Sequence, residues 1–113
     1  MGRDGLGEFE HLVLLAILRS GGEAYSVPIV VELEQRTGRS VAPAAVYIAL
    51  RRLEKRGLLK SRMVESDADT GRPRRYFALE EPAMEKLRDA RQALASLWDG
   101  MDAVLEGGRA GRR

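Results

Sequence analysis

Arginine is the residue type in this chain whose abundance and spacing indicate a binding chemistry. The chain holds 16 arginines and 3 lysines. Arg51 and Arg52 lie near Tyr47 in a stretch with helical periodicity, and residues 71–75 (GRPRR) lie between two strand-like stretches. A guanidinium group can form two parallel hydrogen bonds with a phosphate or with the edge of a guanine. A basic helix followed by a basic β-finger therefore suits duplex DNA. The helix would enter the major groove, and the finger would lie on the adjacent backbone or minor groove.

Three uncharged side chains accompany the arginines on the helix expected over residues 43–56. The hydroxyl of Tyr47 can bond a phosphate, and its ring can pack on a sugar or a thymine methyl group. Ala44 and Ile48 can meet thymine methyl groups as well. Two structural alternatives stay open from the sequence: Tyr47 as a half-buried core residue, and Ile48 as part of the core.

The two helical arginines have different expected partners. Arg51 is the candidate for a bidentate contact with guanine, and it could equally hold a phosphate. Arg52 either faces a phosphate or pairs within the domain, near Glu54 or the finger. The sequence does not decide between these alternatives.

Arg72, Arg74 and Arg75 form the expected contact surface of the finger, because arginine fits both a narrow minor groove and phosphates. Side chains alternate across a strand, so Arg75 could instead point inward and pair within the domain. Weaker phosphate candidates are Lys55, Lys60 and Arg62.

Positive charge gathers in the middle of the chain. Residues 36–75 hold 11 Arg and Lys against 4 Asp and Glu, a net charge of +7 within a chain whose net charge is +2. Such a local excess is typical of a protein that binds nucleic acid, and a solvated face of scattered charges is the simpler alternative. The length suits one domain, and 44% hydrophobic residues predict a folded core.

Chemistry other than binding finds little support in the residues. His11 is the single histidine, and no partner lies near it at the spacing of a metal site or a catalytic base. The sequence has no cysteine, no Gly-rich phosphate loop and no nucleophilic serine elbow. We therefore expect no enzyme activity, metal or cofactor. No secretion signal is evident and the apolar run over residues 12–18 is too short to span a bilayer, which predicts a cytoplasmic protein without membrane contact.

The elements that must position the candidate residues follow from apolar periodicity and from glycine and proline. We expect helices at about residues 6–19, 27–37, 43–56 and 82–106, and a hairpin with strands at 59–65 and 74–79. The fold class is then mostly α with a small β-hairpin, a winged helix-turn-helix plus a C-terminal dimerisation helix. Residues 1–81 would form the DNA-binding domain, 82–106 the dimerisation helix and 107–113 a disordered tail.

Two of the expected helices carry more apolar surface than one small domain can bury. The first helix is apolar nearly all round, and the last has apolar residues at heptad spacing, interrupted by Arg91. These faces predict packing on a second subunit; the alternative is a last helix that folds back on its own domain. Arg91 either fixes the register across the interface or extends its charge to solvent. The expected dimer interface or ligand pocket comprises Leu12, Leu15, Leu87, Arg91, Leu94, Trp98, Met101 and Leu105.

Four segments in order, LGEFEHLVLLAIL, GGEAYSVPI, AVYIALRRLEKRGLL and GRPRRYFAL, resemble the PadR family of bacterial transcriptional regulators. The resemblance covers roughly residues 6–79, and the short single C-terminal helix is similar to that of the smaller PadR subfamily. It implies a homodimeric winged-helix repressor of a palindromic DNA operator, with each C-terminal helix packed on the first helix of the other subunit. Tyr47 matches the tyrosine of the family's third helix. An aromatic residue at the place of Trp98 implies either a filled dimer core or a cavity for a flat aromatic effector.

The sequence departs from the family pattern at two places. Family members often carry a small polar residue where this chain has Ala42 and Pro43, so a phosphate contact or helix cap from that side chain is in doubt. The segment after the hairpin often reads LTxxG, whereas residues 79–83 read LEEPA. This second departure puts the local turn in doubt.

Two alternatives to a dimeric repressor remain from the sequence. The first is a ligand-sensing dimer with a cavity at Trp98, whose output would still be DNA binding. The second is a winged-helix module that binds proteins and has lost DNA binding, against which the basic finger speaks. Salt separates DNA binding from a protein interface, because DNA binding through several phosphates weakens steeply as salt rises.

Overall fold

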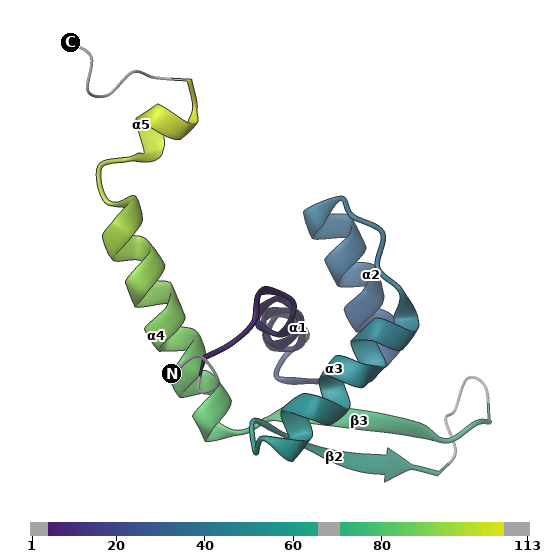
Figure 1. Ribbon diagram of the computed structural model, residues 1–113. Helices are drawn as coiled ribbons and strands as arrows, with labels where there is room; N and C mark the ends of the chain where they lie inside the picture. Colours follow the sequence, from purple (N-terminus) through teal and green to yellow (C-terminus); the bar gives the residue numbers. More distant parts are fainter. Residues whose placement is uncertain (1–4, 66–70, 108–113) are drawn as a thin grey trace.

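The computed structural model describes residues 5–65 and 71–107, and these form a helical body with a small sheet and one protruding helix (Figure 1). The elements in chain order are α1 (Glu8–Arg19), β1 (Glu23–Ala24), α2 (Ser26–Thr37), α3 (Pro43–Lys55), β2 (Leu59–Val64), β3 (Arg74–Leu79), α4 (Glu81–Trp98) and α5 (Asp102–Leu105). The predicted fold class, mostly α with a β-hairpin in a winged helix-turn-helix, is confirmed. Of the expected tail, residues 108–113 lie outside the described residues, as do residues 66–70 of the hairpin loop.

The core lies between the first three helices and the inner face of the sheet. Each helix contributes its apolar stripe, and Phe77 of β3 is fully buried beneath them. Complete burial of one such side chain stabilises a fold by about 1.5–3 kcal/mol. The fully buried large side chains are Val13, Leu14, Ile17, Ile29, Val46, Leu50, Leu53 and Phe77.

Local signals in the sequence fix where α2 ends and where α3 begins. Pro43 starts α3, where its missing N–H would have no helical partner, and Ala42 before it is extended (φ −74°, ψ 126°). Gly38 ends α2 in the left-handed conformation (φ 72°), which glycine adopts at low cost. These boundaries set the turn between the two helices and thereby the direction of α3.

The sheet has three antiparallel strands in the order β1-β3-β2. The hairpin predicted from the sequence, β2 and β3, is present, and β1 is a third strand that was not predicted. Glu23 pairs with Ala78 and Ala24 with Phe77, while β2 and β3 pair in register from Leu59↔Leu79 to Val64↔Arg74. The third strand is only two residues long, too short for a periodic signal. It ties the turn before α2 to the root of the hairpin.

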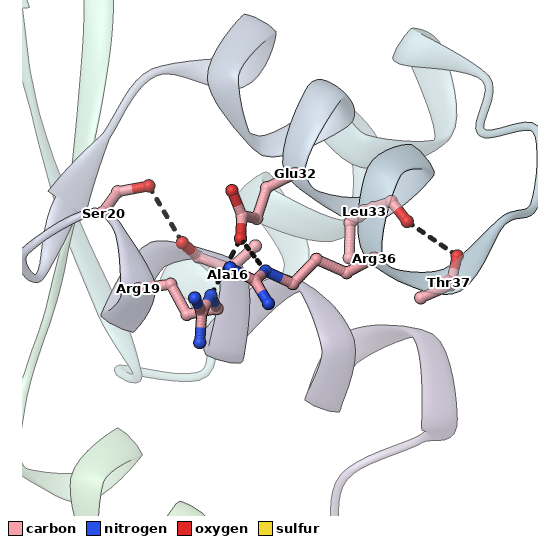
Figure 2. Close-up of polar contacts among 7 residues, drawn as sticks. All are labelled: Ala16, Arg19, Ser20, Glu32, Leu33, Arg36 and Thr37. Atoms are coloured by element: carbon pink, nitrogen blue, oxygen red, sulfur yellow. Dashed lines mark hydrogen bonds and ion pairs between the residues drawn. The ribbon is translucent and has the colours of Figure 1, made fainter.

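The last residue of α1, Arg19, is connected to α2 by a carboxylate of α2 that lies between two guanidinium groups (Figure 2). Glu32 Oε2 accepts hydrogen bonds from Arg19 Nε at 2.8 Å and from Arg36 Nε at 2.6 Å. Hydrogen bonds from Arg36 and Arg19 lower the pKa of Glu32 from its ordinary value of 4.5. The contact connects two helices that the core holds mainly through apolar side chains.

The C-terminal helix is shorter than predicted. Instead of running from 82 to 106, α4 ends at Trp98, and the separate single turn α5 follows. Asp99 is extended (ψ 121°) and Gly100 is left-handed (φ 80°), a conformation that a continuous helix cannot contain. Only the first turns of α4 bury residues, Ala83 and Leu87, and the rest extends away from the body (Figure 1). The molecule is consequently elongated, with extents of 62 × 29 × 21 Å.

Candidate nucleic-acid interface

One face of α3 is left open to solvent by the packing of the other. Val46, Ala49, Leu50 and Leu53 form the buried face. The opposite face is exposed along the whole helix and carries the predicted contacts: Ala44, Tyr47, Ile48, Arg51 and Arg52, followed by Lys55. A shallow hollow of about 420 Å³ lies along it, lined by Ile48, Arg51, Arg52, Glu54 and Lys55.

The exposure of two α3 side chains decides between the alternatives that the sequence leaves open. Ile48 is 56% exposed and therefore not part of the core. Tyr47 is 41% exposed, and its ring meets the edge of the buried Phe77 ring at a centroid distance of 6.2 Å. Tyr47 thus packs its ring against the core and is still exposed at the surface of α3.

Arg51 and Arg52 differ in how they are held. Arg51 Nη1 donates to Tyr47 Oη at 3.1 Å, and its Nε lies 3.4 Å from Glu54 Oε1. The Tyr47 hydroxyl, with Glu54, raises the pKa of Arg51, so its guanidinium stays charged. Arg52 is exposed, and its side chain makes no hydrogen bond or ion pair within residues 5–65 and 71–107. The alternative in which Arg52 pairs near Glu54 is therefore wrong, because Arg51 takes that place.

The wing, which we define as β2, β3 and the loop between them, directs Arg75 inward. Arg75 Nη1 donates to Ser61 Oγ at 3.0 Å, and Ser61 Oγ donates to Glu54 Oε2 at 2.6 Å. Arg75 lies on the same face of β3 as the buried Phe77, which explains the direction. Of the two orientations open from the sequence, the inward pairing is the one observed. Arg72 is exposed at the start of the described part of the wing after residue 70.

The outer face of the sheet carries alternating cations and rings. Arg74 Cζ lies 4.1 Å from the centroid of the Tyr25 ring, the Tyr25 and Tyr76 rings are 5.3 Å apart, and Arg62 Cζ lies 5.1 Å from the Tyr76 centroid. Arg62 also forms two hydrogen bonds with Glu23, at 2.8 and 3.1 Å. The hydrogen bond from Arg62 lowers the pKa of Glu23, and the same bond raises the pKa of Arg62. Arg62, a weak phosphate candidate from the sequence, is thus engaged within the protein.

The wing, α3 and the start of α2 enclose a second hollow of about 350 Å³. Its lining combines the aromatic and basic side chains already described with the first residues of α2. The lining residues are Tyr25, Ser26, Val27, Tyr47, Arg72, Pro73, Arg74, Arg75 and Phe77. All three predicted wing arginines therefore line one hollow together with Tyr47 of α3.

The sequence missed the roles of Glu54, Ser61, Tyr25 and Glu23 at this surface. Glu54 appeared only as a neighbour for Arg52, and nothing in the sequence marked Ser61. The signal that could have found Ser61 is the strand register, because Ser61 pairs with Phe77 and so shares the inward face with Arg75.

Some of the residues predicted for the dimer interface are buried within the single chain, and the others are exposed to solvent. Leu87 is buried within the chain (6% exposed) and Leu12 packs partly on the core, so neither presents its whole side chain to a partner. The others are exposed: Leu15, Arg91, Leu94, Trp98, Met101 and Leu105. An open groove of about 590 Å³ runs between α1 and α4, lined by His11, Leu15, Leu18, Met84, Leu87, Arg88, Arg91, Leu94 and Ala95.

The model of the PadR-like family of transcriptional regulators matches residues 14–89, about two thirds of the chain. The chain belongs to this family. The family and the winged-helix fold support a DNA-binding transcriptional regulator, as the basic face of α3 suggests. No curated protein matches.

Solved structures with the same fold include two PadR family regulators. One, from Clostridium difficile, is 22% identical, with a TM-score of 0.71, and the match covers 88% of this chain and 99% of that one. Another, from Eggerthella lenta, is 27% identical, with a TM-score of 0.66 and coverage of 89% and 88%. A winged-helix DNA-binding protein from STIV is 15% identical, with a TM-score of 0.61 and coverage of 77% and 87%.

The described part of the PadR-like chain lacks membrane-spanning helices and metal-binding clusters. None of its helices combines the length and apolarity needed to cross a bilayer. Within the same residues, no three acidic or histidine side chains gather in a way that could hold a metal ion.

Proposed function

We propose that the protein is a homodimeric repressor that binds a palindromic DNA operator, with α3 in the major groove and the wing on the adjacent backbone or minor groove. The observation that carries this proposal is the open face of α3, which exposes Arg51 and Arg52 and on which Tyr47 lines a hollow together with the wing arginines. A recognition helix of this kind places its exposed side chains on base edges, and the flanking cations hold phosphates.

The protruding α4 supports a dimer. A helix of this length has little stability in water without packing, and the outer half of α4 leaves the body while it carries Leu94, Leu97 and Trp98 exposed. A second copy related by a two-fold axis would cover this half and the groove along α1. Two copies would then present two α3 helices to the two halves of a palindrome.

A gel shift tests the proposal directly. The probe is the DNA upstream of the protein's own gene, with mixed-sequence competitor, at two salt concentrations. We expect a shift that the competitor does not abolish and that weakens steeply with salt, since each neutralised phosphate contributes a slope of about −0.9 in log K against log salt. A folded dimer that shifts no DNA, or that shifts it without salt dependence, would favour the protein-interaction module instead.

The apolar groove favours a second function, in which the dimer also binds a flat aromatic effector. The groove between α1 and α4 is lined mainly by apolar side chains, and Trp98 follows its last lining residue, Ala95, by less than one turn. Quenching of Trp98 fluorescence by a flat aromatic compound, with saturation, would support this role. Unchanged fluorescence across a panel of such compounds would count against it.

A further inference from the structure

The carboxylate of Glu54 lies between the two groups of arginines at the proposed DNA surface. Its Oε1 is 3.4 Å from Arg51 Nε on α3, and its Oε2 accepts the hydroxyl proton of Ser61 on β2 at 2.6 Å. The Glu54 side chain is 29% exposed, so it is shielded on most sides but not withdrawn from the surface. Glu54 is itself a residue of α3, so its carboxylate contacts an arginine of its own helix and a serine of the wing.

Ser61 extends the contact from β2 to β3 in a fixed direction. A hydroxyl has one proton to donate, and Ser61 donates it in the short hydrogen bond to Glu54 Oε2. The Ser61 oxygen is then left to accept, and it accepts from Arg75 Nη1 at 3.0 Å. The chain Arg51–Glu54–Ser61–Arg75 thus joins three elements through one ion pair and two hydrogen bonds.

This chain has two opposite effects on DNA binding. It holds two guanidinium groups at a fixed separation, which favours the sequence whose bases and phosphates match that separation. It also places a negative charge among the cations, which opposes the attraction of any DNA. Affinity for DNA in general and discrimination between sequences should consequently change in opposite directions when Glu54 is neutralised.

We propose that Glu54 is a positioning residue that sets sequence discrimination, by fixing Arg51 of α3 relative to Arg75 of the wing through Ser61. This inference rests on the proposed DNA-binding function and deepens it. Glu54 itself touches no base; it acts through the two arginines.

The test compares Glu54→Gln with a control of equal charge change, Glu65→Gln. Glu65 follows β2 directly, is exposed, and makes no side-chain hydrogen bond or ion pair with any other described residue. Two affinities are measured by fluorescence anisotropy for each protein. One is for a duplex that the wild type selects from a randomised pool, and the other is for a mixed-sequence duplex without that site.

We expect Glu54→Gln to bind the mixed-sequence duplex about two- to fivefold more tightly, the scale of one screened charge. Its ratio of specific to mixed-sequence affinity should fall about tenfold, the scale of one bidentate arginine contact. Glu65→Gln should leave the ratio unchanged. A Glu54→Gln ratio equal to that of the wild type, or a parallel rise in both affinities as in the control, would overturn the proposal.

Ser61→Ala keeps the charge of Glu54 and removes only the connection to Arg75. It should lower the ratio without tightening binding to the mixed-sequence duplex. Equal losses in both affinities, together with a lowered melting temperature, would mean that the chain merely supports the fold, and would refute a positioning role. If the wild type enriches no sequence from the pool, the proposed function fails first, and this inference fails with it.

Discussion

Substitution of Leu94 by Ala gives the sharpest test of the dimer. Leu94 lies on the part of α4 that leaves the body, and it lines the groove shared with α1. It is 50% exposed in the single chain, so about half of its burial is lost from the fold of one subunit and the other half from association. A separate measurement of association isolates the second part.

The magnitude follows from the half of Leu94 that remains open. Complete burial of a leucine contributes about 2 kcal/mol, so covering the open half contributes about 1 kcal/mol in each copy. Two-fold symmetry doubles this to about 2 kcal/mol per dimer. At 1.4 kcal/mol for each factor of ten, Leu94→Ala should raise the dimer Kd about 30-fold.

Sedimentation equilibrium over a range of concentrations measures this Kd. Val31→Ala is the matched control, because Val31 is also an exposed aliphatic residue on a helix but does not line the groove. The control should dimerise as the wild type does, and both variants should lose a similar part of the stability of one subunit, since each residue is about half buried in its own chain. A Leu94→Ala dimer as tight as that of the control would refute the assignment of this face to a second copy.

Three further predictions concern DNA binding and stability. Arg52→Ala should lower operator affinity about tenfold, as measured by fluorescence anisotropy. The free energy of unfolding, measured in urea, should change by less than about 0.5 kcal/mol, because the side chain has no partner among the described residues. Arg74→Ala should weaken binding to all sequences and make the salt slope shallower by about 0.9. Arg19 and Arg36 lower the pKa of Glu32, so its contribution to stability is present above its ordinary pKa of 4.5 and is lost as pH falls through the lower folded value. Glu32→Gln should therefore be less stable than the wild type at neutral pH, and the difference should shrink below about pH 4.5 in thermal melts.

Each of these predictions has a contrary outcome. A destabilised Arg52→Ala would mean that the arginine supports the fold. An unchanged salt slope for Arg74→Ala would remove it from the phosphate contacts. A stability difference for Glu32→Gln that stays constant through acid pH would show that its carboxylate does not stabilise the fold through ionisation.

The helices that position the site could be predicted because their signals are local. Pro43 and the apolar spacing of α3 define its start and its buried face within one stretch of chain. The residues of α3 that are not on the buried face, Arg51 and Arg52 among them, must then lie on the exposed face. Gly100 carried an equally local signal, but the heptad spacing of the surrounding apolar residues outweighed it, and the last helix was predicted to be continuous.

The contacts within the site could not be predicted, because they depend on pairing between distant segments. Arg75 reaches Ser61 only in the observed register of β2 and β3, and alternation along β3 alone left two orientations open. Glu23 meets Arg62, 39 positions away, through a strand of two residues. Such a strand has no period, so its existence depends on the tertiary packing of the turn before α2.

The stack of Arg62, Tyr76, Tyr25 and Arg74 on the outer face of the sheet bears on the entropy of binding. A free arginine side chain has about 2 kcal/mol of rotamer entropy, part of which it must give up when a ligand immobilises it. Arg74 gives up some of this freedom through its contact with Tyr25, where its Cζ lies 4.1 Å from the ring centroid. Tyr25 directly precedes α2, so the same stack connects β3 of the wing to the start of the helix-turn-helix. The wing and the two helices should therefore approach a duplex as one preorganised body.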